Sequence, residues 1–239
     1  MDYSFLIIMA IVFIGAMTQG LTGFGFALIS VPLLSVFMDI KSAIPLGALC
    51  GLVINAALFL KFKNDISFSE IRNLIFGAII GIPAGVIFLR NAPSRILKLL
   101  LAVIILLFAL FSIAGKIKPR GISRNWGYFY GILSGMLGGA FNTNGPPVLI
   151  YSYLQDWDKQ KVKASLIGFF TFTSVVIVSS HALAGLITRG IMVQYLYLLP
   201  VIAVGIIAGN HLFARISAKT YNKVILYSLI GISLLLIFK

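Results

Sequence analysis

The stretch Gly135–Tyr151, GMLGGAFNTNGPPVLIY, interrupts a long apolar region of the chain. Glycine, asparagine, threonine and proline occupy nine of the thirteen positions from Gly135 to Pro147. Glycine and proline are unfavourable inside helices, and the residue before a proline is pushed out of the α region. The stretch therefore predicts a broken helix. Irregular backbone at membrane depth is tolerated only where it faces protein or a wet cavity, so this break is the first place to expect a binding site.

The composition around the break is typical of an integral membrane protein. The 239 residues are 60% hydrophobic and 10% charged, whereas a soluble domain has about 25% charged residues. The net charge of +13 comes from basic residues in short loops between apolar runs. That distribution is typical of membrane orientation and of contact with anionic headgroups. We therefore expect the lipid bilayer, and no nucleic acid, as a partner.

The first apolar run, Tyr3–Met38, is longer than the ~20 residues of one spanning helix. It is interrupted at Thr18–Gly25 by TQGLTGFG, which predicts two shorter helices joined at that segment. The expected fold is an all-α polytopic membrane protein of about eight to ten helical segments. The remaining apolar runs place spans at 42–60, 71–89, 96–114, 164–186, 191–213 and 221–238.

The basic stretch 116–124, KIKPRGISR, divides the chain nearly in half. We expect a transmembrane repeat at 1–115, a linker at 116–124 and a second repeat at 125–239. Each repeat consists of a broken helical hairpin followed by three transmembrane helices. Internal duplication of this kind is common in secondary transporters. Two sets of residues match between the halves: Gly20, Gly23 and Pro32 with Gly135, Gly138 and Pro147, and Gly81 and Gly85 with Gly205 and Gly209.

The basic residues also predict the topology. If each opening run crossed the membrane once, ten of the nineteen Lys and Arg residues would lie on one side and nine on the other. If each opening run turns back as a hairpin, the division becomes thirteen against six. The positive-inside rule favours the hairpins. Because three further crossings follow each hairpin, the two repeats are then inverted and both termini lie outside.

In this topology the two breaks meet near the middle of the bilayer. Broken helices present N-terminal N–H groups and a positive partial charge, and no acidic residue lies inside a predicted span. A carboxylate-free site rich in donors suits a small anion and disfavours ion coupling through a buried carboxylate. The predicted substrate-binding residues are Gln19, Thr22, Gly23 and Gly25 from the first break, and Asn142, Thr143, Asn144, Gly145 and Pro146 from the second.

Other polar residues have structural interpretations beside the functional one. Two interpretations, helix packing and close approach of a ligand, stay open for Gly20, Gly23, Gly135 and Gly138. Close helix packing is the expected role of Gly81, Gly85, Gly205 and Gly209. Hydroxyls such as those of Thr171, Thr173 and Ser174 bond their own helix or line a pathway. His181 is expected to bond a neighbouring helix. The chain shows no catalytic constellation, metal-ligand spacing or cofactor motif, so we expect no enzyme.

The same residues carry a resemblance to a known family. The motifs are GAMTQGLTGFGFALISVPLL at Gly15–Leu34, GILSGMLGGAFNTNGPPVLIYSYL at Gly131–Leu154 and KASLIGFFTFTS at Lys163–Ser174. Over essentially the whole chain, the sequence resembles the TauE/SafE family of sulfite exporters, also called TSUP permeases. The resemblance implies a multi-pass bacterial or archaeal plasma-membrane transporter of sulfite, sulfonate or related organic anions. Members often carry a fuller glycine run in these motifs, where Phe24-Gly25-Phe26 and Phe141-Asn142-Thr143 stand here.

The sequence thus favours a secondary transporter that binds a small anionic substrate between the two breaks and alternates its access. A channel-like anion permease with the same site is the first alternative. A non-transporting membrane scaffold is the second, and two matched polar interruptions argue against it. A homodimer is compatible with the sequence, but no isolated feature points to one.

Overall fold

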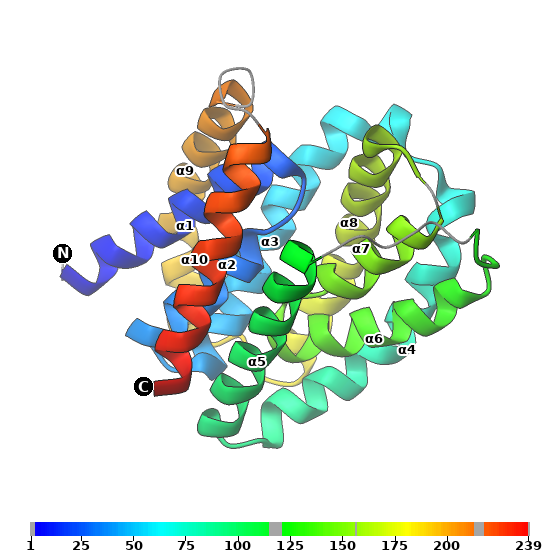
Figure 1. The fold of residues 1–239 in the computed structure, drawn as a ribbon. Helices are drawn as coiled ribbons and strands as arrows, with labels where there is room; N and C mark the ends of the chain where they lie inside the picture. Colours follow the sequence, from blue (N-terminus) through cyan, green and yellow to red (C-terminus); the bar gives the residue numbers. More distant parts are fainter. Residues whose placement is uncertain (1–2, 115–120, 156, 213–217, 239) are drawn as a thin grey trace.

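The computed structural model describes residues 3–114, 121–155, 157–212 and 218–238, and these residues form α-helices joined by short turns (Figure 1). Among them, only the 3₁₀ turn η1 (Lys63–Asp65) is a different regular element. The first half contains α1 (Tyr3–Thr22), α2 (Phe26–Phe37), α3 (Ile40–Phe62), α4 (Phe68–Asn91) and α5 (Ser94–Ala114). The second half contains α6 (Trp126–Phe141), α7 (Gly145–Leu154), α8 (Lys159–Leu183), α9 (Arg189–Leu212) and α10 (Ala218–Phe238).

The helices confirm an all-α polytopic membrane protein. In the described residues, six helices are long and apolar enough to cross a membrane: α1, α3, α4, α5, α8 and α9. Large apolar side chains such as Ile80 and Leu107 are exposed on the outside of the bundle, as expected for surfaces that face lipid. Most of the predicted linker, residues 116–120, lies outside the described residues, so the division at 116–124 stays a prediction.

Polar contacts identify which helix ends lie together. At one end of the bundle, Lys61 at the end of α3 donates to the side chain of Asn210 near the end of α9 at 3.4 Å. At the same end, α4 and α8 both begin, and Lys161 pairs with Glu70. At the opposite end, Ser94 at the start of α5 donates to Asp39 before α3 at 2.9 Å. Consequently α4 and α9 run in opposite directions.

Each opening helix packs on the second long helix of the other half. Helix α6 lies beside α4, and α1 lies beside α9 (Figure 1). A Cβ atom on Gly81 of α4 would collide with the carbonyl oxygen of Ile132 on α6, and one on Gly209 of α9 would collide with that of Met17 on α1. These backbone approaches confirm the packing interpretation of Gly81, Gly85, Gly205 and Gly209.

The contacts also give the directions of the two hairpins. Successive glycines of α4 meet successive residues of α6, so the two helices are parallel, and the same holds for α9 and α1. Helix α7 returns to the end where α6 begins, because Gly121 donates its N–H to the Leu154 carbonyl at 3.0 Å. Since α4 and α9 are opposed, α1 and α6 are opposed too. The two halves are therefore inverted repeats of one arrangement.

The match that the sequence predicted between residues of the two opening hairpins was wrong by about one helical turn. Gly20 was matched with Gly135 and Pro32 with Pro147, whereas the structure ends α1 at Thr22 and α6 at Phe141. The equivalent residues of the two hairpins are thus 119 positions apart (141 − 22 = 119). The glycines are a poor guide to the equivalence because α6 carries more of them than α1, and those at 127, 131, 135 and 139 pack on α4. The match of Gly81 with Gly205 is confirmed by their equivalent contacts.

Both breaks are shorter than predicted. Thr18, Gln19 and Gly20 lie inside α1, and Gly135 to Gly139 lie inside α6. The prolines do not prolong the second break, because Pro146 and Pro147 occupy the first turn of α7, where no N–H is needed. The irregular backbone is reduced to Gly23–Gly25 and Asn142–Asn144.

Candidate functional site: a cavity between the two helix breaks

A small cavity of about 40 Å³ lies between the two breaks. Its size is that of a few water molecules. None of its described lining residues is charged, and they come from both halves: Gln19, Phe24, Gly25, Phe26, Ala27, Leu28, Gly51, Asn55, Asn142, Thr143, Asn144, Gly145, Phe170, Ser174 and Ile177.

The cavity lies where the two repeats meet, and much of its wall is made of equivalent residues. Gly25 and Asn144 are one pair, 119 positions apart (144 − 25 = 119), and Asn55 and Ser174 are another. The same spacing relates three further lining pairs: Phe24 with Thr143, Phe26 with Gly145, and Gly51 with Phe170. Residues from equivalent places in both repeats converge on one point, as in transporters built from inverted repeats.

Two helix N-termini point their backbone donors into this cavity. Helix α2 begins at Phe26 and α7 at Gly145, and neither has a hydrogen bond from a side-chain cap. The first N–H groups of a helix have no partner within it, and they carry a positive partial charge. The two termini differ because Ala27 and Leu28 of α2 correspond to Pro146 and Pro147 of α7, which have no N–H. The α2 terminus therefore offers the larger number of donors.

Side-chain amides and hydroxyls complete the polar wall. Gln19 of α1 donates to the side-chain oxygen of Asn55 on α3, and both line the cavity. Asn144 donates to the hydroxyl of Thr173 on α8 at 3.0 Å. The Thr143 hydroxyl, on a residue that is only 1% exposed, finds no hydrogen-bond partner among the described residues. A buried hydroxyl without a partner is unfavourable unless a ligand supplies one.

The backbone of each break relies on a left-handed residue. Gly23 has φ +83° and its equivalent Asn142 has φ +56°. Glycine adopts this conformation without strain, and asparagine does so more readily than other residues with a Cβ. The conformation ends each opening helix, so that the next helix can start with its N–H groups directed at the cavity.

Six of the nine predicted site residues line the cavity, namely Gln19, Gly25, Asn142, Thr143, Asn144 and Gly145. Thr22, Gly23 and Pro146 do not. Thr22 instead lines a larger cavity beside the first break. The predicted convergence of the two breaks thus agrees with the structure.

Comparison with known proteins places the chain in a family. The family model for sulfite exporter TauE/SafE matches residues 7–236. The chain belongs to this family. It is 27% identical over 228 residues to the probable sulfite/organosulfonate exporter TauE of Cupriavidus necator, covering 91% of this chain and 88% of that protein. No solved structure matches the chain.

Several residues lining the cavity of this TauE/SafE protein are not predictable from motifs. Gly51 and Ile177 are small or apolar residues in apolar helices, and nothing in the sequence marks them; Phe170 lies inside the Lys163–Ser174 motif, but it has no polar group to distinguish it there. The sequence indicates Asn55 only weakly as a site residue, because an amide buried in a membrane span needs a hydrogen-bond partner. Of the hydroxyls, Ser174 lines the cavity.

The remaining polar residues considered above have structural contacts. Thr171 and Thr173 donate to carbonyl groups of their own helix. His181 confirms the expected contact between helices, since its Nε2 lies 2.9 Å from the Gly139 carbonyl oxygen. Among the described residues, no group of His, Cys, Asp and Glu could hold a metal ion.

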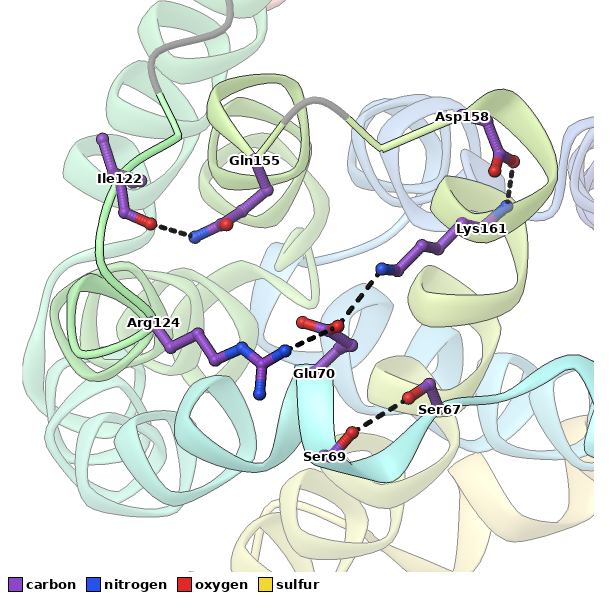
Figure 2. Close-up of polar contacts among 8 residues, drawn as sticks. All are labelled: Ser67, Ser69, Glu70, Ile122, Arg124, Gln155, Asp158 and Lys161. Carbon is purple, nitrogen blue, oxygen red and sulfur yellow. Dashed lines mark hydrogen bonds and ion pairs between the residues drawn. The ribbon is translucent and has the colours of Figure 1, made fainter.

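A second polar cluster lies at the end of the TauE/SafE bundle where α4, α6 and α8 begin. Figure 2 shows Glu70 between Arg124 and Lys161, at 3.0 Å and 3.2 Å. Nearby, Asp158 caps α8 by accepting from the Lys161 N–H, and Gln155 after α7 donates to the Ile122 carbonyl (Figure 2). Glu70 thus joins α4 of the first half to residues at the starts of α6 and α8 in the second.

Proposed function

We propose that this protein is a secondary transporter for small sulfur-containing or organic anions of the sulfite, sulfonate or sulfoacetate type. The observation that carries the proposal is the pair of helix N-termini without side-chain caps that line one buried, uncharged cavity. Such termini attract anions through their free N–H groups and their dipoles. The name of the Cupriavidus necator relative, a probable sulfite/organosulfonate exporter, supports the same class of substrate.

In this proposal the anionic group binds at the start of α2, where Phe26, Ala27 and Leu28 all carry an N–H. The hydroxyl of Thr143 and the amide of Asn142 contact it from the second break. Because the two prolines reduce the donors at the start of α7, the second break contributes mainly side chains. Among its described lining residues there is no carboxylate, so the proposal includes no coupling ion bound by one.

The inverted repeats support alternating access. Two equivalent halves of opposite direction can exchange conformations and so open a shared site to either side. The cavity of about 40 Å³ has room for only a few waters, which supports a small binding site between the repeats rather than a wide pore. A channel-like permease would conduct without saturating, so the dependence of rate on substrate concentration separates the two mechanisms. We propose transport without an enzymatic role.

The test is uptake of ³⁵S-labelled sulfite into proteoliposomes, compared between the natural protein, Asn144→Ala and Thr143→Val. Asn144→Ala removes the amide that holds the break against Thr173, and we expect at least about a tenfold loss of transport. Thr143→Val keeps the shape of the side chain but removes its unpartnered hydroxyl. We expect this variant to fold more stably and to have a raised KM for sulfite.

Natural protein that transports neither sulfite nor a panel of short sulfonates would refute the proposed substrate class. Unchanged kinetics in both variants, with transport intact, would instead move the site away from the second break.

A further inference from the structure

A second, larger cavity of about 650 Å³ opens beside the first break, and we call it the vestibule. It lies at the end of the bundle where α1 and α3 finish and α8 begins. Its volume is in the range of small-molecule sites. Its lining residues are Gly20, Leu21, Thr22, Phe24, Lys61, Phe62, Leu149, Tyr153, Trp157, Gln160, Val162, Lys163, Leu166 and Asn210.

The vestibule is positively charged and partly aromatic. Lys61 and Lys163 line it, and no carboxylate is among its described lining residues. The two ammonium groups lie over the same ring, that of Phe62, at 5.6 Å and 4.9 Å from its centroid. Both ammonium groups line one space, and their combined charge attracts an anion to it. Tyr153 and Trp157 offer apolar surface for an organic group attached to that anion.

Phe24 connects the vestibule with the inner cavity. Among the described residues it is the one that lines both. Its backbone is held in place because the Thr22 hydroxyl donates to the Phe24 carbonyl and accepts from the Phe24 N–H. A fixed backbone leaves rotation of the ring as the simplest way to open a path. The equivalent residue in the second repeat is Thr143, which is much smaller.

We propose that the vestibule is a second anion subsite on the route to the inner cavity, and that the Phe24 ring closes the passage between them. This proposal rests on the proposed function for the identity of its ligand, a sulfite or a short sulfonate. The anion first binds between Lys61 and Lys163, with any organic group against Trp157. It then passes Phe24 to the N–H groups at the start of α2.

The experiment uses charged thiol reagents, so its readout does not depend on transport. In a Cys50→Ala background, Gln160→Cys places a thiol in the vestibule and Ser174→Cys places one behind Phe24. Each protein is labelled in phosphatidylcholine vesicles with a sulfonate-bearing methanethiosulfonate and with its trimethylammonium analogue. Such vesicles contain no net anionic lipid, so a lipid headgroup does not account for any preference for anions.

We expect the anionic reagent to modify Gln160→Cys faster than the cationic one, and each Lys61→Gln or Lys163→Gln change to reduce this preference about fivefold at low salt. Lys163→Arg keeps the charge and should keep the preference. Lys63→Gln is the matched control, because Lys63 is exposed at the same end but does not line the vestibule. Phe24→Ala should accelerate modification of Ser174→Cys at least about tenfold and leave that of Gln160→Cys unchanged.

A preference that survives both Lys→Gln changes would overturn the subsite. If Ser174→Cys were labelled at the same rate with and without the Phe24→Ala change, the Phe24 ring would not close a passage between the two cavities. If the preference holds while sulfite and sulfonates are not transported, the vestibule stands as an anion site and the proposed function fails.

Discussion

Asn142 shows how one residue serves both the backbone and the cavity. Its left-handed φ of +56° ends α6, and its side chain lines the cavity. We expect Asn142→Gly to keep the stability of the protein, because glycine adopts this conformation freely, while transport falls with the loss of the amide. Asn142→Ala should lose the same transport and also about 1–2 kcal/mol of unfolding free energy, since a Cβ without the polar group disfavours this conformation. Thermal unfolding of the purified variants and sulfite uptake measure the two effects separately.

Equal melting temperatures for Asn142→Gly and Asn142→Ala would show that the backbone strain argument is wrong. Full transport in Asn142→Gly would show that the side chain does not contact the substrate. Gly23 is the equivalent residue, so Gly23→Ala provides a second measurement of the same strain.

Residues of the two breaks were predictable from sequence because polar and glycine residues are conspicuous in an apolar chain. The other walls of the cavity were not. Gly51 and Phe170 look like any residue of a buried helix, and only the packing of α3 against α8 turns them toward the cavity. Phe24 was seen as a departure from a glycine-rich motif, and its position between two cavities depends on how the hairpin folds.

At the scale of elements, the glycine contact between α4 and α6 holds one half against the other. A Cβ on Gly81 would overlap the backbone of Ile132, and no rotation of a side chain relieves an overlap between backbones. We expect Gly81→Ala to destabilise the protein by more than about 2 kcal/mol. For a protein of this size the melting temperature should then fall by at least ~4 °C.

Gly231→Ala is the control within the same protein. Gly231 lies in α10, and a Cβ there meets nothing within 4 Å. Alanine favours the helix by about 1 kcal/mol over glycine, so this change should leave the melting temperature equal or higher. If both variants melted alike, close backbone packing would not be what Gly81 provides.

The helices themselves were largely predictable, but the lengths of the breaks were not. Length and hydropathy identify spans because the bilayer requires them. Helix propensity measured in water penalises Gly135 and Gly139, yet these residues are helical because Ala78 and Ile82 of α4 pack directly on their backbone. A neighbour that is distant in sequence thus decided where α6 ends, and single-sequence rules carry no information on such a neighbour.

For the whole molecule, the proposed topology places both termini outside. The end of the bundle with Lys61, Glu70 and Arg124 then faces the cytoplasm, in keeping with the excess of basic residues there. We expect alkaline phosphatase fused to the C-terminus to be active in bacterial cells. A green fluorescent protein that fluoresces only in the cytoplasm should be dark at the C-terminus and bright when inserted in the 116–124 linker. The reverse pattern would invert the topology without changing the fold.

Each opening helix packs on a long helix of the other half, and this arrangement has a consequence for the order in which contacts form during synthesis. Helix α4 packs its glycine face on α6, which the ribosome makes only after α5 and the linker. Helix α1 remains without its packing partner for longer, because that partner, α9, is among the last segments to be made. The first half therefore has two helix faces, and its half of the inner cavity, without their final neighbours until the second half has been made.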